Sequence, residues 1–84
     1  MDHEELRHRV LLGGSDANIR FDDLCRLLAW LGFKERVRGS HHIFRKQGVG
    51  ELINLQKEGN KAKVYQVRQV RRIIVRYGLL GGER

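Results

Sequence analysis

Apolar residues recur every three or four positions in two segments of the chain, and this spacing predicts two amphipathic helices. The first stripe is formed by Phe21, Leu24, Leu27, Leu28 and Leu31. The second is formed by Val64, Val67, Val70, Ile73, Ile74 and Tyr77. A glycine follows each stripe, Gly32 and Gly78, and predicts where each helix ends, because glycine readily adopts the left-handed conformation found there.

Between these helices the period changes to two, which is typical of β-strands. The alternation predicts three strands, at residues 34–38, 41–46 and 51–56. We expect Gly39-Ser40 to form a two-residue turn between the first two strands, and residues 47–50 to form a loop before the third. Residues 57–63 are polar and predict a connector to the second helix.

The order helix, three strands, helix predicts an α+β fold of two layers, in which a three-stranded antiparallel sheet has both helices on one face. This domain is expected to span residues 21–80. Before it, residues 3–12 predict a short helix with Leu6 and Val10 on one side and Gly13-Gly14 at its end. We expect residues 1–20 to be an N-terminal extension.

Strand alternation assigns a face to each residue of the second strand. Phe44 and His42 are expected to point inward, beneath the helices, whereas His41 and Arg45 project from the open face of the sheet. The residues expected to join Phe44 in the core are Val37, Ile53 and Leu55. The residues expected beside His41 on the open face are Arg36, Arg38, Asn54 and Gln56.

The 84 residues have a formal net charge of +7, and this charge is unevenly distributed. Residues 1–33 contain four Lys or Arg and six Asp or Glu, whereas residues 34–84 contain thirteen and four. Such a basic surface on a small domain favours nucleic acid as the partner, with an acidic protein or an anionic membrane surface as alternatives. A solvated basic face that binds nothing is the remaining alternative.

The composition is that of one small globular domain, with 40% hydrophobic and 32% charged residues and no proline, which excludes collagen-like and proline-rich disordered chains. The single cysteine cannot form an internal disulfide, and the acidic start does not resemble a secretory signal, so we expect a cytoplasmic protein. The apolar runs are far shorter than the roughly 20 residues of a membrane helix, so no membrane span is expected.

An outward-facing histidine among arginines suggests chemistry on a phosphodiester. A neutral imidazole can accept the proton of a ribose 2′-hydroxyl, and guanidinium groups can stabilise charge on the phosphate. This chemistry requires neither a metal nor a cofactor, and we expect none. An exposed histidine in a basic sheet can also be a binding or incidental residue, so the pattern alone leaves catalysis open.

The residues around the predicted turn also resemble a known motif. Gly39-Ser40-His41, with the aromatic Phe44 after two further residues, resembles the signature of the HicA toxin family. Further similar segments are residues 24–33, 53–56, 59–63, 65–72 and 77–79, so that the resemblance covers about residues 15–80. Many members have a second histidine or a proline-containing turn after the third strand, where this chain has Gln56-Lys57-Glu58-Gly59-Asn60.

This resemblance implies a double-stranded-RNA-binding-domain-like fold and an endoribonuclease that cleaves mRNA and is held inactive by a HicB-type antitoxin. It assigns the catalytic role to His41. Together with the charge pattern, it leads us to expect RNA contacts from Arg36, Arg38, Ser40, Arg45, Lys61, Lys63, Arg68 and Arg72. Two other functions stay open: a non-catalytic RNA-binding module, and an interaction domain whose basic face meets an acidic antitoxin.

Cys25 lies beside apolar positions of the first predicted helix, and we interpret it as a small buried hydrophobe rather than a reactive thiol. A zinc site is not predicted, because the sequence lacks paired Cys-x-x-Cys and His-x-x-x-His spacings. The candidate ligands considered for such a site are His3, His8, Cys25, His41 and His42.

Overall fold

The structure is a computed structural model that describes residues 2–82. Its helices are α1 (His3–Leu12), α2 (Phe21–Trp30) and α3 (Val64–Tyr77), with a single 3₁₀ turn, η1 (Asp16–Asn18). Its strands are β1 (Lys34–Arg38), β2 (His41–Arg45), β3 (Ile53–Leu55), β4 (Lys57–Glu58) and β5 (Lys61–Ala62). Within residues 2–82, no helix is long and apolar enough to cross a membrane.

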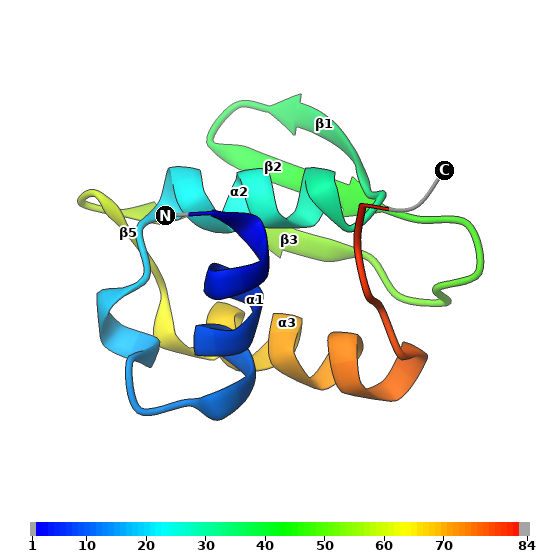
Figure 1. Cartoon of the computed structure of the whole chain (residues 1–84). Coiled ribbons are helices and arrows are strands. Elements are labelled where there is room, and N and C mark those ends of the chain that lie inside the picture. The colour runs from blue at the N-terminus through cyan, green and yellow to red at the C-terminus, as the bar shows by residue number, and fades with distance from the viewer. Residues whose placement is uncertain (1, 83–84) are drawn as a thin grey trace.

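Strands β1, β2 and β3 form an antiparallel sheet with β2 in the centre, and the helices pack on one side of it (Figure 1). Arg38 pairs with His41 across the hairpin, and Gly39 has a φ of 58°, so the two-residue turn with glycine first is confirmed. The predicted α+β fold is therefore confirmed. Strand β3 is shorter than predicted, because only residues 53–55 pair with β2.

The predicted connector after β3 contains a second, two-stranded hairpin, formed by β4 and β5 around the turn at Gly59-Asn60. This hairpin is joined to the segment before α2. The Ala62 N–H donates to the Ile19 carbonyl at 3.0 Å, and the Phe21 N–H donates to the Asn60 carbonyl at 3.0 Å. These bonds fix the start of α2 against the start of α3.

The core lies between the sheet and the helices. Phe44, Ile53 and Leu55 of the sheet are fully buried in it, as strand alternation predicts. Leu6 and Val10 of α1 are buried in the same core, and α1 contacts both α2 and α3. The N-terminal helix therefore packs on the domain and covers apolar surface of both other helices.

Val37 was expected in this core, and that prediction is wrong, because its side chain is 55% exposed. Every residue of β1 is exposed, because the helices do not extend over this edge of the sheet, whereas β3 at the other edge (Figure 1) is covered by α3. The neighbouring inward position on β2 is filled by His42, whose ring meets the edge of Phe21 with the ring centres 4.9 Å apart. Alternation gives the face of a strand residue correctly, but not how far the helices extend over it.

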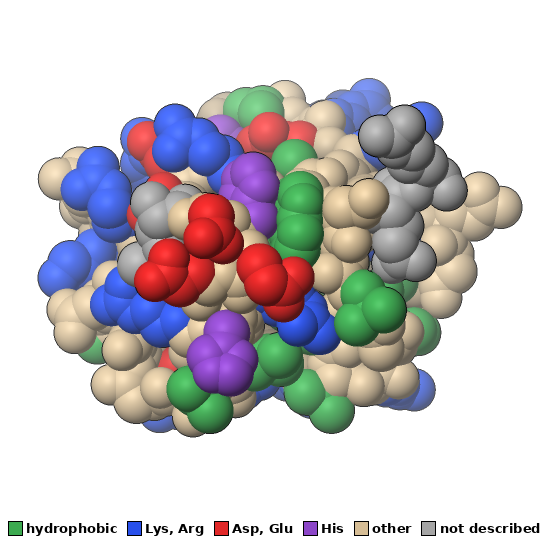
Figure 2. All heavy atoms as spheres, in the orientation of Figure 1, with side chains coloured by type: hydrophobic (Ala, Val, Ile, Leu, Met, Phe, Trp, Pro, Cys, Tyr) green, Lys and Arg blue, Asp and Glu red, His purple; other side chains and the backbone are tan. Residues whose placement is uncertain are grey.

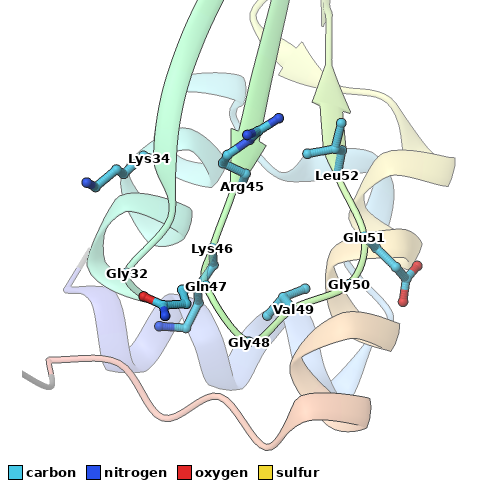
Figure 3. A pocket seen from close by; sticks show the side chains of 10 residues that line it. All are labelled: Gly32, Lys34, Arg45, Lys46, Gln47, Gly48, Val49, Gly50, Glu51 and Leu52. Carbon is cyan, nitrogen blue, oxygen red and sulfur yellow. The ribbon is translucent and has the colours of Figure 1, made fainter.

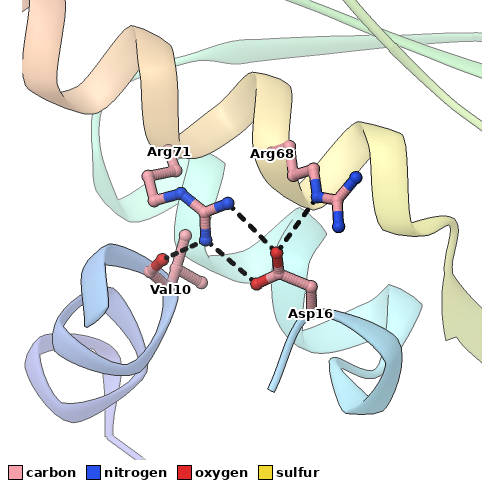
Figure 4. Close-up of polar contacts among 4 residues, drawn as sticks. All are labelled: Val10, Asp16, Arg68 and Arg71. Atoms are coloured by element: carbon pink, nitrogen blue, oxygen red, sulfur yellow. Dashed lines mark hydrogen bonds and ion pairs between the residues drawn. The ribbon is translucent and has the colours of Figure 1, made fainter. Parts of the chain in front are cut away.

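A partly buried ion pair joins α1, η1 and α3 (Figure 4). Both Asp16 carboxylate oxygens accept hydrogen bonds from Arg71 at 3.0 Å, and Arg71 also donates to the Val10 carbonyl at 3.2 Å. Arg68 contacts the same carboxylate at 3.5 Å. The hydrogen bonds from Arg71 hold the pKa of Asp16 below its ordinary value of 3.8.

Asp16→Asn should lower the free energy of unfolding at pH 7 by about 1 to 3 kcal/mol, because it removes a charge-assisted bidentate contact. The pKa of Asp16 is lower in the folded protein than in the unfolded chain, so its ionised carboxylate stabilises the fold. This stabilisation is complete at a pH above the pKa that Asp16 has in the unfolded chain, and it is lost as the pH falls through the pKa that Asp16 has in the folded protein. The difference between parent and variant in urea unfolding should therefore shrink as the pH falls below about 3.8. A difference that stays constant from pH 7 to pH 2 would contradict this assignment.

Candidate nucleic-acid interface

His41 is the first residue of β2, directly after the hairpin turn, and its side chain is exposed on the open face of the sheet. Arg38 lies directly opposite it on β1. Because residues two apart on a strand share a face, Arg36 and Arg45 lie farther along the same surface. The outward orientation of His41 agrees with the prediction from strand alternation.

Among the described residues, one side chain, that of Asn54, forms a hydrogen bond with the His41 ring. The Nδ1 atom of His41 lies 3.1 Å from Oδ1 of Asn54 on the neighbouring strand β3. An amide oxygen only accepts hydrogen bonds, so Nδ1 donates, and the proton of the neutral ring lies on Nδ1. The other ring nitrogen, Nε2, then has a free lone pair with which it can accept a proton.

The turn before His41 is fixed by a chain of polar contacts to α3. Gln56 donates from Nε2 to Oγ of Ser40 at 3.1 Å. In the amide orientation that satisfies both its oxygen and its nitrogen, the buried side chain of Gln66 on α3 exchanges two hydrogen bonds with the backbone of Gln56, at 3.2 and 3.0 Å. The turn is thus connected through the end of β3 to the helix layer, which limits the movement of His41.

His42 has a different environment from His41, although the two are adjacent. Its Nδ1 lies 2.6 Å from a carboxylate oxygen of Glu35, and Phe21 covers one side of its ring. His42 therefore points toward the helices, as predicted, and does not share the open face with His41.

Two hollows lined by basic residues follow the open face away from His41. One, of about 330 Å³, is lined by Lys34, Glu35, Arg36, Arg38, Ile43, Arg45 and Leu52. The other, of about 730 Å³, lies inside the loop between β2 and β3 and is lined by residues 45–52 with Gly32 and Lys34 (Figure 3). The two hollows adjoin, since Lys34, Arg45 and Leu52 line both, and we call them together the basic groove.

The arginines of the basic groove differ from those of α3 in their partners. Among residues 2–82, no carboxylate forms an ion pair with Arg36, Arg38 or Arg45. On α3, by contrast, Arg68 pairs with Asp16, and Arg72 pairs with Glu51 at 3.9 Å. The basic groove therefore keeps positive charge available for a ligand.

Of the eight predicted RNA-binding residues, Ser40 is adjacent to His41 and Arg38 lies directly opposite it, whereas Arg36 and Arg45 lie farther along the same face of the hairpin. Lys61 lies on β5 and donates to Asn18 at 3.2 Å, and Lys63 precedes the first residue of α3. Arg68 pairs with Asp16 of η1, and Arg72 pairs with Glu51 of the loop before β3. For all eight residues, a contact with RNA stays a prediction.

The face formed by α1 and α2 has a different charge from the basic groove. Figure 2 shows acidic side chains gathered near the middle of this face, with Lys and Arg toward its edges. The first turns of α1 and α2 contain Glu4, Glu5, Asp22 and Asp23. Acidic residues there complement the partial positive charge of a helix N-terminus, and they keep this face from extending the basic surface.

Three residues of the open face and the basic groove were not assigned a role from the sequence. Strand alternation placed Asn54 on the open face, but its contact with His41 is diagonal, since Asn54 pairs with Ile43 in the sheet register. Lys34 and Lys46 line the basic groove because the loop between β2 and β3 folds back toward Gly32. The sequence contains no signal for the shape of that loop.

Comparison with models of protein families identifies a toxin family. The model of a family described as "HicA toxin of bacterial toxin-antitoxin" matches residues 21–75, which is most of the chain and includes the whole sheet. Comparisons with curated proteins and with solved structures gave no match.

The hydrogen bond to Asn54 predicts the tautomer of the His41 ring. In ¹⁵N NMR spectra at a pH where the ring is neutral, His41 should be protonated on Nδ1, and Asn54→Ala should remove this preference. Exposed His8 on α1 provides the reference, because its tautomer should be the same in both proteins. A His41 ring protonated on Nε2 in the parent protein would rule out this role of Asn54.

Proposed function

Because the chain belongs to the HicA family of bacterial toxin–antitoxin toxins, we propose that it is an endoribonuclease that cleaves mRNA at the open face of its sheet and so inhibits translation in the cytoplasm. The observation that supports this most strongly is the position of His41. It is exposed, no hydrogen bond to its Nε2 forms within residues 2–82, and it lies directly opposite Arg38, which lines the basic groove.

In the proposed reaction, the ribose 2′-hydroxyl attacks the adjacent phosphorus. Nε2 of His41 accepts the hydroxyl proton, the bond from phosphorus to the 5′-oxygen breaks, and that oxygen takes a proton from water. The products are a 2′,3′-cyclic phosphate and a 5′-hydroxyl. Arg38, directly across the hairpin, stabilises the negative charge that develops on the phosphate.

Asn54 acts as a positioning residue in this mechanism. It holds the Nδ1 proton of His41 and so directs the lone pair of Nε2 away from the sheet. It also stabilises the protonated ring that forms when His41 accepts a proton, since both ring nitrogens then donate hydrogen bonds.

The basic groove holds the RNA backbone beside the point of cleavage. From the pair Arg38–His41 to the pair Lys34–Arg45 the strands advance by four residues, or about 13 Å. Arg36 and Arg45 lie along this path, and Lys34 and Lys46 extend it into the loop. Lys61, Lys63, Arg68 and Arg72 would contact more distant parts of a longer RNA.

The family implies an antitoxin partner, and we propose that it is a HicB-type protein that covers the basic groove. Inhibition requires that phosphate be kept from His41, and an acidic or substrate-mimicking segment does this while pairing with Arg36, Arg38 and Arg45.

His41→Ala should reduce the cleavage rate of single-stranded RNA by roughly 10² to 10⁴, which is the usual contribution of a general base. His8→Ala is the matched control, because it removes another exposed histidine, on α1, and should cleave at the parent rate. An all-deoxy oligonucleotide should bind but resist cleavage, since it lacks the 2′-hydroxyl. Equal cleavage by parent and His41→Ala would refute the mechanism. No products from the parent, with RNA binding intact, would favour the non-catalytic RNA-binding module.

Arg45→Ala should weaken RNA binding at every sequence tested and reduce the salt dependence of the affinity, by about 0.7 in the log–log slope for each phosphate that the protein no longer neutralises. Arg26→Ala is the control, because it removes the same charge from α2, where Arg26 pairs with Asp23. Filter binding at several salt concentrations gives both slopes. Identical slopes for the two variants would show that net charge, rather than the basic groove, determines binding.

A further inference from the structure

Three potential metal ligands lie together on the inner side of the hairpin, on the opposite face of the sheet from His41. They are Cys25 of α2, Glu35 of β1 and His42 of β2, and their donor atoms all lie within 4.8 Å of one another. The three residues come from three different elements of the fold. No role is given to this cluster by the proposed nuclease mechanism.

We propose that Cys25, Glu35 and His42 bind one Zn²⁺ ion, with water as the fourth ligand. A thiolate, an imidazole and a carboxylate are the three side-chain types that zinc prefers. Three protein ligands and one open position are typical of zinc sites that are not purely structural. The thiolate selects zinc and similar ions over Mg²⁺ and Ca²⁺, which prefer ligand sets made of oxygen.

The distances between the three ligand atoms are close to those that tetrahedral coordination of zinc requires. Zinc bonds of about 2.0 to 2.3 Å place neighbouring ligand atoms about 3.4 to 3.6 Å apart. The His42–Glu35 hydrogen bond, at 2.6 Å, must lengthen, and the wider separations, which reach at most 4.8 Å, must shorten. Side-chain rotations can supply both changes, because Glu35 is 37% exposed and its strand lies at the sheet edge.

Neighbouring residues limit the movement of the other two ligands, His42 and Cys25. The edge of Phe21 packs on the His42 ring with an interplanar angle of 77°, which fixes the ring plane while Nδ1 faces Glu35. Cys25 is half-buried on α2, between the buried Leu24 and the core residues Leu27 and Leu28. Helix α2 therefore presents the sulfur to the hairpin from a rigid base.

The charges around the cluster allow a divalent cation. Burial, with the nearby charge of Glu35, raises the pKa of the Cys25 thiol to about 12, so the thiol loses its proton only when the ion binds. The thiolate and the Glu35 carboxylate then balance the two positive charges of the ion, and Asp22 adds a further negative charge nearby. Lys57, whose ammonium group lies 5.6 Å from the centre of the Phe21 ring, and Arg26 oppose the cation. Lys57 is on a strand of only two residues and is exposed, so it can turn away from a bound ion.

Binding would connect α2 to the β1–β2 hairpin, which presents His41 on its other face. The proposal does not depend on the nuclease function, because it concerns the inner face of the hairpin and requires no RNA. Its failure and the failure of the proposed nuclease are therefore separate results.

The test uses the full chain after treatment with a chelator, titrated with Co²⁺ as a spectroscopic substitute for zinc. We expect a thiolate-to-cobalt charge-transfer band and the visible absorption of tetrahedral cobalt, both reaching a plateau at one equivalent, and their loss when Zn²⁺ is added. Cys25→Ser should abolish the charge-transfer band. His42→Ala and Glu35→Gln should each weaken Co²⁺ binding by at least the roughly 10- to 100-fold known for residues that only support a metal ligand.

His41→Ala and His8→Ala are the matched controls, and both should bind Co²⁺ as the parent does. Circular dichroism identifies any variant that fails to fold. If a variant does not fold, the same site is tested in the parent protein by alkylation of Cys25, from which one equivalent of Zn²⁺ should protect the thiol. The proposal is overturned if no charge-transfer band forms, if the band persists unchanged in both His42→Ala and Glu35→Gln, or if it requires two chains for each ion.

Discussion

The burial of Phe44 determines which residues of β2 are available for function. Phe44 is fully buried beneath the helices, and the period of two then places His42 inside and His41 outside. A slip of one residue would exchange the two histidines and bury Arg45, which would have no ion-pair partner there. Because truncating a buried phenylalanine typically costs about 3 to 5 kcal/mol, this register is held firmly. Both the candidate nuclease site and the candidate zinc site follow from it, on opposite faces of the same strand.

A second constraint is the distribution of charge. The carboxylates of the fold are used mainly on the helix side, where Asp16 neutralises Arg68 and Arg71, and Glu51 lies beside Arg72 and Arg76. The arginines of the open face have no such partner within the described residues, so their positive charges are available to a polyanion. The fold thus separates the cations that stabilise it from those that are available for binding.

Much of this arrangement could be predicted from the sequence, because it depends on local periodicity. The period of 3.6 located α2 and α3, Gly39 located the hairpin turn, and alternation gave the faces of His41, His42 and Phe44. The prediction for Val37 is wrong because the reach of the helices over an edge strand is a property of packing, not of pattern. The burial of Leu6 and Val10 against α2 and α3 also depends on packing, which periodicity within α1 alone does not reveal.

The contacts that give the site its chemistry were harder to predict. Asn54 meets His41 diagonally across two strands, and Cys25 meets Glu35 and His42 from a separate helix. Sequence reasoning combined Cys25 only with histidines and did not consider Glu35, because zinc motifs are recognised by spacing along the chain, whereas these ligands converge only in the folded structure. Three-dimensional proximity between residues far apart in sequence is the information that periodicity lacks.

The chemistry of the RNA ends left by cleavage tests the central claim most directly, namely that the outward imidazole of His41 activates the ribose 2′-hydroxyl. If it does, the purified protein should leave a 2′,3′-cyclic phosphate on the upstream fragment and a 5′-hydroxyl on the downstream fragment, both identifiable by mass spectrometry of a short synthetic RNA. A 3′-hydroxyl with a 5′-phosphate would mean that water attacks the phosphorus instead, and would contradict the account.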